Sequence, residues 1–122
     1  MNRRLKQFDR LEKVAEARKQ MALAELLRTK HQRVRVEHEL SELSRQTAAR
    51  LAAGDISVIS GWLRWVDQRR AQLNSELAIL SAKHENALTF SRTEWGRSNA
   101  LCKLTAKAKL DHRRSQGQDQ TS

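Results

Sequence analysis

Apolar residues recur at intervals of three and four positions through much of the second half of the chain. From Ile59 to Ala87 the two intervals alternate, which averages about 3.5 residues, the heptad spacing that lets one face of a helix pack against another helix. We therefore predict a coiled-coil seam along this segment. Its residues are Ile59, Leu63, Val66, Arg70, Leu73, Leu77, Leu80, His84 and Ala87.

The pattern is less regular outside this segment. Beyond Ala87 it predicts that the seam shifts by one residue. The shifted seam is Leu88, Trp95 and Cys102, with Leu101 and Leu104 alongside. The first half of the chain predicts an interrupted seam, which is weakest between Arg28 and Glu39, where Val34 and Val36 are the only aliphatic residues. The predicted seam residues of this half are Phe8, Leu11, Ala15, Ala22, Leu26, Leu40, Leu43 and Leu51.

One clear break interrupts the helical composition. Residues 3–53 contain no glycine or proline and are rich in Ala, Leu, Glu, Arg, Lys and Gln, which are strong helix formers. Gly54 suits the left-handed conformation that ends a helix, and Asp55 or Ser57 can cap the next one. The sequence predicts a helix over about 3–53, a turn over 54–57, a second helix over about 58–114 and a disordered polar tail over 115–122.

Reversal of the chain at this turn would place apolar residues of the two helices opposite one another. Leu43 then faces Val66, and the small Ala15 faces the large Trp95, as close packing favours. We predict an all-α fold, in which two long helices form an antiparallel coiled-coil hairpin. A single long helix that pairs with a second copy is the alternative, and the break at Gly54 argues against it.

The composition gives no support for an enzyme. Among the 122 residues there is no proline, and aromatic residues make up 4%, too few for a conventional globular core with a pocket. No metal, nucleotide or nucleophile motif occurs, so we predict no catalytic, cofactor-binding or metal site and no small-molecule substrate. The single cysteine rules out an intramolecular disulfide. The residues that carry reactive or ligating groups are scattered: His31, His38, His84, His112 and Cys102.

Charge and tryptophan are both unevenly distributed. Of the formal net charge of +10, residues 1–19 and 97–114 together account for +9, and these segments would lie side by side in a hairpin. Such a surface can be a solvated face or a site for an anionic partner. Trp62 and Trp65 cannot both point into the seam, so at least one is expected to stay exposed. An exposed Trp is typical of a binding anchor, whereas a buried one would thicken the packing, and the sequence allows both.

Several of these residues resemble the pattern of the FliJ family, the small coiled-coil stalk proteins of flagellar and other type III export machines. The resemblance covers most of the chain and includes the turn, a tryptophan early in the second helix and a later tryptophan before a basic segment. The residues that carry it are Gly54-Asp55-Ile56-Ser57, Trp62, Trp65, Arg69-Arg70-x-x-Leu73, Ala87, Trp95-Gly96-Arg97, Leu101 and Leu104.

The resemblance implies a non-enzymatic, cytoplasmic protein that lies peripheral to a membrane-embedded export apparatus. It implies that the paired terminal helices enter a hexameric export ATPase and stimulate it. It also implies that the region near the turn contacts an export-gate membrane protein, with export chaperones as further partners. The implied ATPase-binding residues are Arg3, Arg4, Arg10, Lys103, Lys107 and Arg113. The implied gate-binding residues are Trp62, Trp65 and Arg69.

Two other functions fit the sequence less well. A helical-hairpin secretion chaperone would need an exposed apolar groove for an amphipathic segment of an export substrate. A basic coiled coil associated with nucleic acid would bind with an affinity that falls steeply with salt, but Asp9, Glu12 and Glu16 interrupt its basic run. No signal peptide or transmembrane segment is visible, which favours a cytoplasmic location. The choice between a flagellar and an injectisome system stays open.

Overall fold

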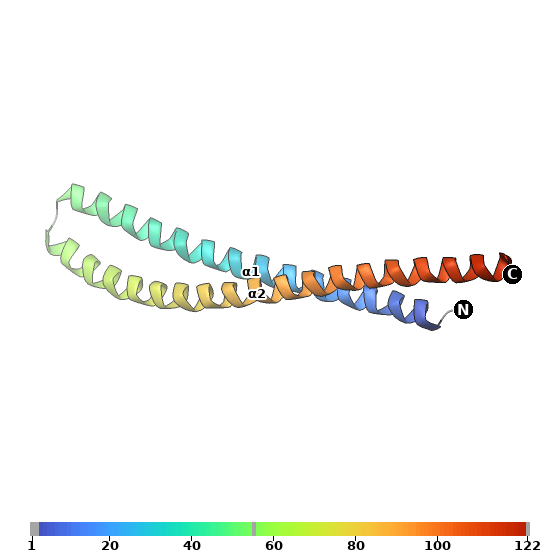
Figure 1. The fold of residues 1–122 in the computed structure, drawn as a ribbon. Helices are drawn as coiled ribbons and strands as arrows, with labels where there is room; N and C mark the ends of the chain where they lie inside the picture. The colour runs from blue at the N-terminus through green and yellow to red at the C-terminus, as the bar shows by residue number, and fades with distance from the viewer. Residues whose placement is uncertain (1–2, 55, 122) are drawn as a thin grey trace. The chain divides into compact units, whose positions relative to one another are not determined.

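The computed structural model describes residues 3–54 and 56–121. These residues form two long helices, α1 (Arg3–Ala53) and α2 (Ile56–Thr121), and no strand occurs among them. The helices pack against each other in an antiparallel hairpin (Figure 1). The prediction of an all-α helical hairpin is therefore confirmed.

Gly54 ends α1 in the conformation that the sequence predicts. Its φ is 85°, in the left-handed region that other residues rarely adopt, and its N–H donates to the Arg50 carbonyl oxygen at 3.4 Å. This bond satisfies one of the carbonyl groups that a helix end leaves unpaired. The connection is shorter than the predicted turn of 54–57, because α2 already begins at Ile56. Asp55 lies outside the described residues.

The far end of α2 also differs from the sequence-based boundary. The helix does not stop at Arg114 but continues through Thr121, so residues 115–121 are helical where a disordered tail was predicted. No proline interrupts this segment. Gly117 is its weakest helix former, and a glycine inside a helix costs only about 1 kcal/mol relative to alanine. Ser122 lies outside the described residues.

The contacts divide the chain into two compact units. We call Leu26–Ala87 the turn unit, and Met1–Glu25 together with Leu88–Ser122 the terminal unit. In each unit a segment of α1 lies antiparallel beside a segment of α2. The two units are built on different kinds of seam, one apolar and one largely polar.

The turn unit contains the apolar core. Buried Val36 and Leu43 of α1 pack with buried Val66, Leu73 and Leu80 of α2. Half-buried side chains complete the cluster, namely Leu40, Trp62 and Leu77. Most of the seam predicted for α2 is thus confirmed. It fails at one position near the turn, since Leu63 is exposed and the seam passes through Trp62 instead.

The predicted weak stretch of α1 holds a polar layer of the turn unit. Thr29 is 1% exposed, and its hydroxyl donates to the Leu26 carbonyl oxygen at 3.0 Å. Thr29 Oγ1 also lies 3.2 Å from Nδ1 of half-buried His84, across the seam. Buried polar atoms are tolerated when they are hydrogen-bonded, so this layer joins the two helices through a polar contact. Val34 is exposed, and so is Leu51 nearer the turn, both outside the seam.

In the terminal unit the predicted register shift is wrong. Trp95 and Cys102 are exposed, and the seam of α2 instead keeps its alternation of three and four residues. Its buried residues are Ser91, Glu94, Ser98 and Thr105. On α1, Ala22 is buried and Phe8 and Ala15 are half-buried, but Leu11 is exposed. A continuous helix cannot move its seam by one residue unless its winding changes locally, so the face set by the regular spacing continues.

Shortening Leu73 tests the apolar core. Leu73 is fully buried, so Leu73→Ala should lower the free energy of unfolding by about 2–5 kcal/mol, through lost burial and the cavity left behind. Ile79 is 58% exposed on the same helix, and Ile79→Ala should change stability by less than about 0.5 kcal/mol. Urea unfolding followed by circular dichroism measures both. Equal effects of the two substitutions would contradict the assigned seam.

Two glycine substitutions should have opposite signs. Gly54→Ala should lower the free energy of unfolding by about 1 kcal/mol, because a Cβ is strained at positive φ. Gly61 lies inside α2 with no atom within 4 Å of an added Cβ, so Gly61→Ala should raise it by roughly 0.5–1 kcal/mol. Thermal unfolding of both variants checks the pair. A stabilising Gly54→Ala would show that the turn is not held in this conformation.

Candidate protein-binding surfaces

The terminal unit concentrates the positive charge of the protein. It has fourteen Lys and Arg residues against seven Asp and Glu residues, a net charge of +7 of the total +10. Each side chain implied as ATPase-binding belongs to this unit and is exposed: Arg3, Arg4, Arg10, Lys103, Lys107 and Arg113. Arg4 shares a hollow with Asp111 and His112, so the structure brings Arg4 beside the last basic stretch of α2.

Few acidic groups compensate these cations. In the described part of the chain none of the six forms an ion pair, and Arg4 instead stacks over Phe8 at 5.8 Å from the ring centroid. Ion pairs seen in this unit join neighbours on one helix, such as Lys13 with Asp9 at 3.3 Å. Exposed like charges held together repel one another, which opposes pairing of the helices here. The surface is therefore suited to an anionic partner.

Lys19 links the two helices of the terminal unit. Its ammonium lies 4.0 Å from the centroid of the Trp95 ring on α2 and 3.2 Å from Glu16 Oε2 on its own helix. A hydrogen bond from Gln20 and the nearby Lys19 lower the pKa of Glu16 below its usual value. A carboxyl group whose pKa is lowered by folding stabilises the folded chain above its unfolded pKa and loses this effect as the pH falls. Trp95 was predicted to lie in the seam opposite Ala15. It lies instead outside the seam, exposed and in contact with Lys19.

The two tryptophans near the turn have different surroundings. Trp62 is half-buried, its indole N–H donates to Thr47 Oγ1 at 3.2 Å, and the guanidinium of Arg50 stacks 3.9 Å above its ring. Trp65 is 48% exposed, with its ring centroid 5.0 Å from that of Trp62. Trp62 thus holds the helices together, and Trp65 is the one that presents an aromatic surface to solvent.

Arg69, the third residue implied for gate binding, is engaged within the turn unit. Its Nη2 lies 2.6 Å and its Nε 3.2 Å from Glu39 Oε1 on α1, and its Nη1 donates to Gln72 at 3.3 Å. A charge held by such hydrogen bonds across the seam is less free to bind a partner than an exposed one. The sequence did not show this pairing because Glu39 is far from Arg69 along the chain.

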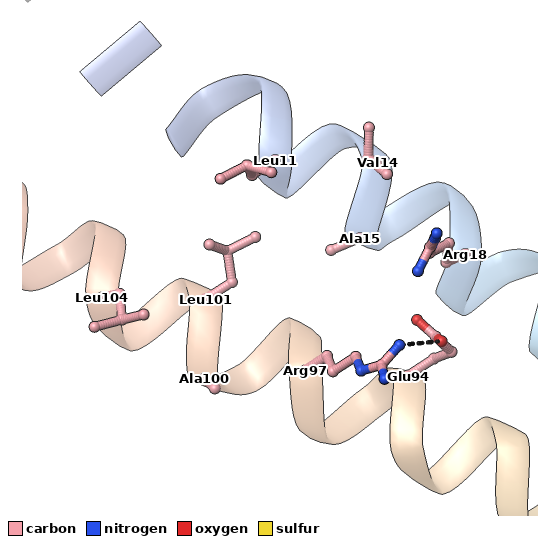
Figure 2. A pocket seen from close by; sticks show the side chains of 9 residues that line it. All are labelled: Leu11, Val14, Ala15, Arg18, Glu94, Arg97, Ala100, Leu101 and Leu104. Atoms are coloured by element: carbon pink, nitrogen blue, oxygen red, sulfur yellow. Dashed lines mark hydrogen bonds and ion pairs between the residues drawn. The ribbon is translucent and has the colours of Figure 1, made fainter. Parts of the chain in front are cut away.

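An apolar groove lies on one side of the terminal unit, and the sequence analysis missed it. Its volume is about 470 Å³, and side chains from both helices line it (Figure 2). The signal was present in the sequence, since an apolar residue directly precedes several seam positions. The lining residues are Leu11, Val14, Ala15, Arg18, Glu94, Arg97, Ala100, Leu101 and Leu104.

No group of three or more His, Cys, Asp or Glu side chains among the described residues is placed to hold a metal ion. Cys102 is exposed and unbonded to another cysteine. Neither helix, over the described residues, contains a stretch apolar enough and long enough to cross a membrane.

Replacement of each tryptophan by phenylalanine separates their roles. Trp62→Phe removes the N–H donor to buried Thr47 and should lower the free energy of unfolding by about 1–2 kcal/mol. Trp65→Phe is the matched control, and should cost less than about 0.5 kcal/mol because its ring is half exposed. Denaturant unfolding measures both. A larger loss at Trp65 would reverse the assignment.

Comparison with known proteins gives no further guide to the function. No protein-family model, curated protein or solved structure matches the chain.

Proposed function

We propose that this protein is a non-enzymatic stalk or adaptor of a flagellar or type III export apparatus, and that it binds and stimulates a hexameric export ATPase. The observation that carries the proposal is the composition of the terminal unit. A net charge of +7 and a polar seam are combined in one pair of helices. The resemblance of the turn and tryptophan pattern to the FliJ family supports the same role.

The mechanism is electrostatic and mechanical. Exposed basic residues on both helices would seat against acidic or polar groups that line the ATPase ring, which relieves the repulsion between them. Lys103 and Lys107 are four residues apart on α2, so they share one face and can act together. The protein supplies no chemical step. Its contribution is a helix pair that orders or turns the subunits around it.

The proposed contact with an export-gate membrane protein rests on Trp65. This side chain is half exposed beside Trp62, which holds it in place through ring contact. Trp62 and Arg69 then act as supports, because each is bound to a residue of α1. A cytoplasmic location, peripheral to the export apparatus, is part of the same proposal.

A second candidate is a helical-hairpin secretion chaperone. It requires an exposed apolar groove, and the terminal unit has one between Leu11 and Leu104. An export substrate with an amphipathic segment would lie along it. A stoichiometric complex with a filament or hook subunit, without ATPase stimulation, would favour this candidate over the stalk.

Charge reversal on α2 tests the stalk proposal. Lys103→Glu combined with Lys107→Glu should reduce stimulation of the host's export ATPase to the basal rate, because two exposed cations of the binding face are lost. Helicity should be unchanged, since both side chains are exposed. The measurement is ATP hydrolysis by the ATPase at near-physiological salt, with increasing amounts of each variant, and circular dichroism for the fold.

The matched control reverses two exposed lysines of the turn unit, Lys30→Glu and Lys83→Glu. It makes the same change in net charge and should leave stimulation intact. Equal stimulation by the wild type and the Lys103/Lys107 variant would refute the proposed site. Lack of any stimulation by the wild type would refute the proposed function itself.

A further inference from the structure

The groove of the terminal unit is apolar on both walls. Leu11 and Val14 form the wall on α1, and Leu101 and Leu104 form the wall on α2 (Figure 2). The small Ala100 also lines the groove from α2. Leu11, Val14 and Leu104 are each more than half exposed to solvent. Apolar side chains clustered around a depression, rather than scattered singly, mark a surface that another molecule covers.

The same side of the helices continues beyond the groove. Met21 follows Val14 by seven residues on α1, and Phe90 precedes Leu104 by fourteen on α2. Residues one or two heptads apart lie on nearly the same face of a helix. Met21 is 71% and Phe90 48% exposed, so apolar side chains recur on this face beyond the lined groove. Arg18 and Arg97 lie between these residues and the groove leucines, so the face alternates apolar and basic side chains along the helix axes.

The charges around the groove select the kind of partner. Arg18 and Arg97 line it, one from each helix. Arg97 is 3.3 Å from Glu94, whose side chain is 2% exposed, so the only carboxylate among the lining residues is turned into the seam. Arg18 forms no hydrogen bond or ion pair within the described chain. Both arginines belong to the terminal unit, whose net charge is +7.

We infer that this groove binds an amphipathic α-helix of another protein, with an apolar stripe flanked by acidic residues. The apolar stripe would cover Leu11, Val14 and Leu104, and the acidic flanks would approach Arg18 and Arg97. A second copy of this chain is a poorer occupant, because it would bring two units of charge +7 together. An acidic helix would instead be attracted by the positive charge of the terminal unit.

The dimensions fit a helix of two to three turns. At about 1.5 Å per residue, the lining segment of α2 from Glu94 to Leu104 is roughly 15 Å long, and that of α1 from Leu11 to Arg18 is roughly 10 Å long. A bound helix lies along such a groove with side chains at positions i, i+3 or i+4, and i+7. Three apolar side chains of the bound helix would therefore span the groove.

This inference rests on the second candidate function, which lays an amphipathic segment along the same groove, and it is tested separately from the stalk proposal. It rests on the groove and its charges, and no export ATPase enters its test. Peptide binding can fail while ATPase stimulation succeeds, and the reverse also holds. The two proposals therefore stand or fall separately.

The probes are two synthetic helical peptides of about 21 residues with the same heptad leucines. One has glutamate at the flanking positions and the other has lysine. Fluorescence anisotropy of the labelled peptides, titrated with the full chain, measures binding. The acidic peptide should bind at least about tenfold more tightly than the basic one, and its affinity should fall several-fold between low and high salt.

Two matched variants locate the site. Leu11→Glu combined with Leu104→Glu should weaken binding of the acidic peptide by at least about tenfold. Leu27→Glu combined with Leu110→Glu replaces two similarly exposed leucines outside the groove lining and should leave binding unchanged apart from the shared charge effect. Circular dichroism checks that both variants keep their helices, as exposed positions should.

Four results would overturn the inference. Equal affinity for the acidic and basic peptides would show that charge does not select the occupant. Undetectable binding of the acidic peptide, or binding equally weakened in both variants, would remove the groove as its site. Sedimentation that shows a dimer of the wild type, lost only in the Leu11/Leu104 variant, would assign the groove to a second copy of the chain.

Discussion

The register of the heptad spacing is the constraint on which the rest of this structure depends. No proline interrupts either helix, and the buried positions of α2 keep their alternation of three and four residues from the turn unit into the terminal unit. A change of register would require local over- or underwinding of the helix. The seam therefore passes through Ser91, Glu94 and Ser98, although apolar Phe90 and Trp95 lie one position away.

Because of this register, the two units bury different kinds of side chain. The turn unit buries a cluster of aliphatic side chains and closes its polar layer with the Thr29–His84 hydrogen bond. The terminal unit buries mainly hydroxyl groups and Glu94, and one hydroxyl, that of Thr105, has no hydrogen-bond partner among the described residues. Because little apolar surface is buried and like charges repel, the pairing of the helices is less strongly stabilised in the terminal unit than in the turn unit. The proposed ATPase contact and the proposed groove both lie in this unit.

Apolar residues that the register keeps out of the seam form the candidate binding surfaces. Leu11 and Leu104 line the groove, and Trp65 lies exposed beside Trp62. Trp95 is covered in part by the Lys19 ammonium. Each of these residues is one position from the seam. A single geometric cause thus accounts for the polar seam and for the exposed apolar face beside it.

The sequence by itself determined the all-α hairpin, the first helix over 3–53 and the left-handed end at Gly54, because helix propensity and glycine geometry act locally. It also located Val66, Leu73 and Leu80 in the core, where apolar spacing and register agree. Only the tertiary structure decided the rest. Arg69 pairs with a carboxylate thirty residues away, and the row of α2 that forms the seam beyond Ala87 follows helix continuity and the facing helix rather than the nearest apolar residues.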